Sequence, residues 1–183
     1  MNEFQLQGIN HIALVCKDMG RTVDFYTNTL GLKLIKTIAL PDGGQHFFFD
    51  IGNGEAIAFF WFPQAPEAAP GIASARPDAW QTANLTTAHG SLNHLAFKVS
   101  FEKLQEYREK LVAKGVQVAT PVLHHTDLPA GIVRELDEGT FISSVYFYDP
   151  DGIMLEFAAN VRELGDPDRD IQHQPATAVS TTN

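Results

Sequence analysis

Residues 9–17 read INHIALVCK, and residues 92–100 read LNHLAFKVS. Each stretch sets an Asn-His pair ahead of an apolar run with the length and composition of a β-strand. In both cases apolar residues at helical spacing follow, and they end at Gly31 in the first copy and at Gly115 in the second. A repeat of this kind indicates that one chain holds two related structural units.

Each copy predicts a strand, a helix and three further strands. Asp18 is placed as the N-cap and Gly31 as the C′ residue of the first helix, and Ser100 and Gly115 take these roles in the second. The turns GNG and PDG favour a hairpin at the end of each copy. The strands after the helices are expected at 32–40, 45–52, 55–62, 116–125, 141–149 and 153–159.

The expected architecture is an α+β fold in which two βαβββ modules form one domain at 1–164. The modules cover about 8–62 and about 92–160. A loop with four prolines joins them, and a connection of its length is typical of segments that bind something or are disordered. The tail is polar and aperiodic, which predicts disorder. These irregular stretches are the loop 63–91, a second loop-like stretch at 124–140, and the tail 165–183.

The composition excludes several classes of partner. The formal net charge is −9, from 13 Lys and Arg against 22 Asp and Glu, which disfavours nucleic acid and anionic membranes because both need basic patches. The single cysteine, Cys16, allows no disulfide within the chain and is interpreted as a small buried hydrophobe. No apolar run reaches the length of about 18 residues that a membrane span needs, and the first residues lack the pattern of a secretory signal. A cytoplasmic location is therefore expected.

The alternation of strand faces groups the polar residues that could carry chemistry. His11 shares a face with Ala13, and His94 shares a face with Ala96, while the larger apolar neighbours would pack under the helices. Glu156 stands within the apolar run GIMLEFAA, where an unpaired buried carboxylate would cost several kcal/mol. It therefore needs a cation or a strong donor.

Two imidazoles and one carboxylate facing one cavity make a metal site of the 2-His-1-carboxylate type, with coordination positions left open. Taken alone, each histidine could be an ordinary core or surface residue, and Glu156 could pair with an arginine or lysine. The equivalent positions of His11 and His94 in two related units favour the metal site.

Three stretches carry a resemblance to a known family: NHIALVCKDMGRTVDFYTNTLGLKL, LNHLAFKV and VYFYDPDGIMLEFAA. Over about 8–160 the chain resembles the vicinal oxygen chelate superfamily of glyoxalases, extradiol dioxygenases and fosfomycin-resistance proteins. The resemblance implies a cup-shaped mixed sheet with helices on its outer face, and a metal inside held by His11, His94 and Glu156. It also implies a homodimer, and it leaves open whether His11 and Glu156 meet within one chain or across two.

Within that family the chain looks nearest to small extradiol dioxygenases. Glyoxalase I would place a fourth ligand where Ala58 or Phe60 stands here, with Glu55 close by at the strand start. Two histidines and one glutamate match the extradiol iron site. By the same resemblance Tyr146 would contact a substrate hydroxyl, although it could also be an ordinary strand aromatic.

The match to extradiol dioxygenases lacks two histidines, at positions held by Ala79 and Asp137. Three loop histidines could replace the missing acid–base residue: His89, His124 and His125. Three residues are expected to bind substrate, namely His46, Phe48 and His89, beside an apolar wall that suits a ring-sized substrate.

Three functions follow in order of preference. The first is extradiol-type cleavage of a catechol-like aromatic substrate by O2, with a divalent metal for which Fe(II) is favoured. The second is a glyoxalase-like lyase, isomerase or hydrolase that uses Mn, Ni, Co or Zn as a Lewis acid. The third is a non-catalytic small-molecule binding or resistance protein, which the presence of His11, His94 and Glu156 disfavours.

Overall fold

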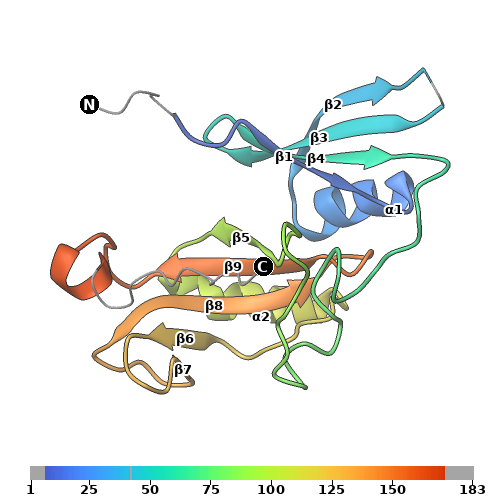
Figure 1. The fold of residues 1–183 in the computed structure, drawn as a ribbon. Helices are drawn as coiled ribbons and strands as arrows, with labels where there is room; N and C mark the ends of the chain where they lie inside the picture. The colour runs from blue at the N-terminus through green and yellow to red at the C-terminus, as the bar shows by residue number, and fades with distance from the viewer. Residues whose placement is uncertain (1–6, 42, 172–183) are drawn as a thin grey trace.

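The computed structural model describes residues 7–41 and 43–171, which form two modules, each with one β-sheet and one main helix (Figure 1). The first sheet has the strand order β1-β4-β3-β2, and the second has the order β5-β9-β8-β6-β7. In each module the first strand pairs in parallel with the last, and the remaining pairs are antiparallel. The predicted α+β class and its βαβββ modules are thereby confirmed.

The first module follows its sequence pattern closely. Asp18 accepts a hydrogen bond from the backbone N–H of Arg21 and caps the helix, and Gly31 has the positive φ of 78° that a C′ residue needs. The helix begins as an α-helix and ends in a π-type turn. The elements are β1 (His11–Val15), α1 (Met19–Asp24), η1 (Phe25–Thr29), β2 (Lys33–Ala39), β3 (Gln45–Gly52) and β4 (Glu55–Trp61).

The second module departs from its pattern at three points. The strand expected at 116–125 is divided near Pro121, which has no N–H for a sheet ladder, so that only an isolated bridge at Val118 precedes β6. Ser100 precedes the helix but makes no side-chain capping bond. An additional strand, β7, pairs with β6 inside the loop-like stretch. The elements are β5 (Leu95–Lys98), η2 (Phe101–Lys103), α2 (Leu104–Ala113), β6 (Leu123–Thr126), β7 (Ile132–Val133), β8 (Thr140–Tyr148) and β9 (Met154–Asn160).

The helix-bearing sides of the two modules meet in one core. Figure 1 shows α1 between the first sheet and the second module. The buried Tyr26 donates its hydroxyl hydrogen to Asp149 of the second module at 3.2 Å, and Lys114 at the end of α2 donates to the carbonyls of Asn28 and Thr29. The opposite faces of the two sheets therefore point away from this core, and the expected cup is not closed within one chain.

The inter-module segment 63–91 runs from the first module onto the second sheet (green in Figure 1). Ala75 and Ala79 are fully buried there, and the Tyr148 hydroxyl donates to the Arg76 carbonyl at 3.1 Å. The segment therefore packs on part of this sheet. Of the two roles expected for such a long loop, binding or disorder, this packing does not fit disorder.

The first part of the tail is also ordered. Residues Pro167–Ile171 form a short π-type helix, η3, and Asp170 pairs with Arg162 at 2.6 Å. Arg162 also pairs with Asp127 at 2.9 Å, which ties this segment to the stretch after β6. Within the tail for which the sequence predicts disorder, residues 167–171 thus take a helical turn, and residues 172–183 lie outside the described residues. Among the helices that the structure describes, none is long and apolar enough to span a membrane.

Candidate metal centre

The second sheet brings three of the predicted site residues together. His94 lies directly before β5, and its Nε2 is 3.0 Å from Oε2 of Glu156 on β9. Tyr146 on β8 is the register partner of Glu156, so that both side chains lie on the same face. The carboxylate is almost completely buried, with 5% of its side chain exposed. The Tyr146 side chain, whose side of the sheet the sequence left undetermined, thus lies on the same side as the candidate site.

The repeated Asn-His pairs have the same geometry in both modules. Nδ1 of His11 lies 2.7 Å from Oδ1 of Asn10, and Nδ1 of His94 lies 2.9 Å from Oδ1 of Asn93. Because an amide oxygen only accepts hydrogen bonds, each Nδ1 carries a proton, and each Nε2 is the ring nitrogen that would be available to a metal. This is how residues beside a metal ligand usually set the tautomer of a coordinating histidine.

Hydrogen bonds keep the buried Glu156 carboxylate ionised. Burial raises the pKa of the Glu156 carboxyl, but hydrogen bonds from His94 and Ser144 outweigh this effect, and the pKa lies below its usual value. Ser144 donates its hydroxyl hydrogen to Oε1, and the Tyr146 hydroxyl also bonds to the carboxylate. Nε2 of His94 and Oε2 of Glu156 lie 3.0 Å apart, and a cation bound between them would take the place of the proton of this hydrogen bond.

The two neighbouring histidines on β6 fall on opposite faces. Nε2 of His125 lies 3.1 Å from the Tyr146 hydroxyl, on the face of the candidate site. His124 points to the other face, where its Nδ1 lies 2.7 Å from the Ser143 hydroxyl. Of these two acid–base candidates only His125 belongs to the site. The third candidate, His89, is exposed in a turn of the inter-module segment.

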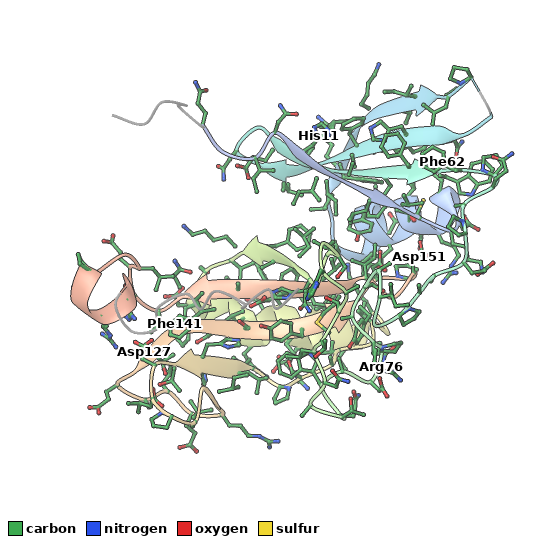
Figure 2. The ribbon with its side chains drawn as sticks, in the orientation of Figure 1. His11, Phe62, Arg76, Asp127, Phe141 and Asp151 are labelled. Atoms are coloured by element: carbon green, nitrogen blue, oxygen red, sulfur yellow. The ribbon has the colours of Figure 1, made fainter. Side chains whose placement is uncertain are left out.

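His11 does not join this cluster within one chain. It is exposed on β1 of the first module (Figure 2). Its ring lies 5.4 Å from that of Phe48 on the first sheet. Within residues 7–41 and 43–171, no group of three or more His, Cys, Asp or Glu side chains is arranged to hold a metal ion. The convergence of His11, His94 and Glu156 is therefore absent from the single chain, because the two site faces lie on opposite sides of the shared core.

The first sheet carries one candidate ligand, His11, and no carboxylate at the position equivalent to Glu156. Ala13 pairs with Ala58 as Ala96 pairs with Glu156, so Ala58 stands at the position equivalent to the carboxylate. Glu55 instead accepts the backbone N–H of Ile9 at 3.1 Å.

His46 and Phe48 lie on the same face of the first sheet as His11. The His46 ring stacks on Phe60 with a centroid distance of 3.6 Å and meets the edge of Phe48 at 4.3 Å. Nδ1 of His46 is 3.1 Å from the carbonyl oxygen of Phe59, so it must be the protonated nitrogen and Nε2 is left as an acceptor.

Four residues at or beside the site were not anticipated from the sequence: Asn10, Asn93, Ser144 and Trp80, whose ring lies 4.6 Å from that of Tyr146. The repetition of the Asn-His dipeptide was a signal for the first two. Ser144 could have been found by strand alternation, because it lies two residues before Tyr146 on β8. The place of Trp80 depends on how the inter-module segment packs, and no local pattern indicates it.

Residues 8–157 match the Glyoxalase/Bleomycin resistance protein/Dioxygenase superfamily, and the chain belongs to this family. The superfamily includes enzymes that act on small molecules, mostly with a divalent metal.

Individual relatives are distant. The uncharacterized protein YwkD of Bacillus subtilis is 27% identical over 152 residues, which cover 82% of this chain and 95% of YwkD. MhqE of Bacillus subtilis, provisionally named a ring-cleaving dioxygenase, is 25% identical over 161 residues, which cover 80% of this chain but only 46% of MhqE.

The fosfomycin resistance protein FosX of Listeria monocytogenes is 26% identical over 158 residues, which cover 86% of this chain and 93% of FosX. A crystal structure of FosX aligns with a TM-score of 0.54 at 24% identity, covering 86% of this chain and 96% of that one. This structural likeness supports the fold.

Proposed function

We propose that the chain is a metal-dependent, extradiol-type ring-cleaving dioxygenase that acts on a catechol-like substrate as a homodimer. The metal would be held by His94 and Glu156 of one subunit and by His11 of the partner subunit. The observation that carries the proposal is the convergence of His94, Glu156 and Tyr146 on one face of the second sheet.

The donor set fits a divalent metal. Asn10 and Asn93 each accept a hydrogen bond from Nδ1 of the neighbouring histidine, which directs the two Nε2 atoms to a metal, and one carboxylate is kept ionised. Such a facial set leaves positions for a substrate. When bound, Fe(II), which we favour over Mn, Ni, Co or Zn, would supply the electron chemistry that a reaction with O2 requires.

The outward orientation of both site faces supports a site shared between two chains. His11 lies on β1, and His94 lies directly before β5. Among the described strands, β1 and β5 are edge strands, each with a sheet neighbour on one side only. Exposed apolar side chains accompany these edges, such as Val15 at 51% exposure. A twofold dimer that joins β1 of one chain to β5 of the other would cover these edges and bring His11 of the partner subunit to the buried carboxylate.

Tyr146 and His125 can manage the protons of the reaction. Burial, together with the charge of Glu156, raises the pKa of Tyr146 well above its ordinary value, so the phenol stays neutral. Burial lowers the pKa of His125, which is therefore also neutral near pH 7. Ring cleavage breaks the ring carbon–carbon bond beside the diol and adds one atom of O2 to each of the two carbons, so the ring-opened product keeps every atom of both reactants. Hydroxyl protons that leave as the diol binds would therefore have to be held nearby and returned. The hydrogen-bonded pair of Tyr146 and His125 would accept and return one of them.

The aromatic wall of the first sheet suits a flat substrate. In the dimer Phe48, Phe60 and His46 would face the metal from the subunit that supplies His11. Stacked rings offer an apolar surface against which an aromatic ring can pack, while Nε2 of His46 offers a single acceptor.

Two observations favour a second candidate, a Lewis-acid lyase, isomerase or hydrolase on the same metal. Ala79 and Asp137 hold the places where extradiol enzymes carry histidines. Ala79 is fully buried, and the Asp137 carboxylate is occupied by hydrogen bonds from Thr126, Thr140 and Gly139. The similarity to FosX, whose name denotes fosfomycin resistance, is compatible with chemistry that does not use O2.

The two candidate activities differ in the metal that they need and in their need for O2. Protein stripped of metal is reloaded with Fe(II) or Zn(II) and tested against a panel of catechols in air and under argon. We expect ring-cleavage product with Fe(II) in air alone, and none from Glu156→Gln, which keeps the size of the side chain and removes its charge. No turnover on a broad catechol panel rejects the dioxygenase. Turnover of an epoxide or a hemithioacetal with Zn(II) under argon would establish the second candidate.

A further inference from the structure

Trp80 reaches the candidate metal centre from the inter-module segment. Its indole packs on the ring of Tyr146 with a centroid distance of 4.6 Å, and the ring of His94 also meets that of Tyr146, at 5.7 Å. Buried Ala75 and Ala79 hold the segment against Tyr146, Tyr148 and Met154. Trp80 is thus separated from the buried carboxylate by a single side chain.

The indole N–H of Trp80 is buried without an acceptor in the part of the chain that the structure describes. A buried donor without a partner destabilises the folded state, and such groups are rare in native proteins. A phenylalanine could make a similar ring contact with Tyr146 and would carry no orphan donor. Conflicts of this kind between local packing and stability are expected at functional sites.

We propose that the Trp80 indole N–H is a ligand-binding group, which donates a hydrogen bond to an oxygen of the small molecule held at the metal. The inference rests on the proposed function, because the oxygen-bearing ligand is the one that the metal centre would bind. Trp80 adds an uncharged donor beside Tyr146, and no other buried polar side-chain atom without a partner occurs among the described residues of this segment. It makes the inter-module segment part of the binding site.

The other tryptophan of the chain provides a matched control. Trp61 donates its indole N–H to the carbonyl of Lys17 at 3.1 Å, so this donor already has a partner. Trp80→Phe and Trp61→Phe make the same chemical change, in one case to an orphan donor and in the other to a satisfied one. We expect the urea midpoint to fall in Trp61→Phe and to stay unchanged or rise in Trp80→Phe.

Ligand binding is measured with Mn2+-loaded full-length protein, titrated with 4-nitrocatechol and separately with oxalate. Both probes carry two neighbouring oxygens, and only the first is aromatic. We expect Trp80→Phe to bind these probes about five- to ten-fold more weakly than the wild type, the effect of one hydrogen bond. Mn2+ affinity should be unchanged, and Trp61→Phe should bind the probes as the wild type does.

The outcomes separate the inference from the proposed function. Equal probe affinity in Trp80→Phe and wild type overturns the inference, and so does a urea midpoint that falls as far as that of Trp61→Phe, since the donor would then have a partner in the free protein. If 4-nitrocatechol fails to bind while oxalate binds and is weakened by Trp80→Phe, the inference stands and the catechol assignment falls. If neither probe binds the wild type, both are rejected.

Discussion

Replacing Asp149 by asparagine should remove a large pH dependence of stability. Asp149 is buried between the modules, where it accepts hydrogen bonds from the backbone N–H groups of Asp151 and Ile153 and from the Tyr26 hydroxyl. Burial raises the pKa of its carboxyl from 3.8 to about 6, against the lowering effect of these bonds. The folded state therefore holds this proton more tightly than the unfolded state does.

The sign and size of the effect follow from this difference. The contribution of Asp149 to stability is full below pH 4 and is lost as the pH rises through about 6. A shift of roughly two pKa units corresponds to about 3 kcal/mol of unfolding free energy. Asparagine can accept the same backbone N–H bonds and has no charge to bury. From pH 4 to pH 8 the wild type should thus lose about 2 to 3 kcal/mol relative to Asp149→Asn.

Urea unfolding of both proteins between pH 4 and pH 8 measures this difference, since every other titrating group is common to the two. Tyr26→Phe is an informative companion. It removes a donor that lowers the pKa of Asp149, so the loss of stability should extend to higher pH. Stability curves for wild type and Asp149→Asn that run parallel across the range would refute the reasoning.

Two further predictions concern the site itself. Asn10→Ala and Asn93→Ala should each weaken Mn2+ binding about 10- to 100-fold, because each removes a group that orients a metal-binding histidine. Calorimetric titration with Mn2+ measures this change. Unchanged affinity would mean that the Asn-His bonds have no role in metal binding. His125→Ala should lower kcat strongly, whereas His124→Ala should leave kcat unchanged and cost about 1–3 kcal/mol of stability through the unpaired Ser143 hydroxyl. Equal loss of turnover in both variants would contradict the assignment of faces.

Local sequence patterns were sufficient to predict the two βαβββ modules. The helix between Asp18 and Gly31 has its cap, its end and its apolar spacing written in consecutive residues, and the structure follows them. The strand expected at 116–125 failed because Pro121 interrupts it, which a stricter reading of proline would have caught. The helical turn at 167–171 was not predictable from composition, because it accompanies the pairing of Arg162 with Asp127 and Asp170.

The sequence predicted which side chains share one face of a sheet, but not how the site faces of the two modules are arranged relative to each other. Strand alternation placed Glu156 and His94 on one face because a side chain reverses direction at each residue. It could not assign His124 and His125, since the end of a broken strand fixes no face. The separation of His11 from Glu156 depends on the contact of the two helix-bearing sides, including Tyr26 with Asp149, which joins residues far apart in the chain.

Mixing two inactive variants tests the shared metal centre most directly. His11→Ala and Glu156→Gln each damage every site of their own dimers. In a mixed dimer one site carries both changes and the other carries neither, so after random exchange of subunits bound Mn2+ should recover to about one quarter of the wild-type amount. No recovery, although subunit exchange is shown by differently tagged chains, would contradict a site built from two chains.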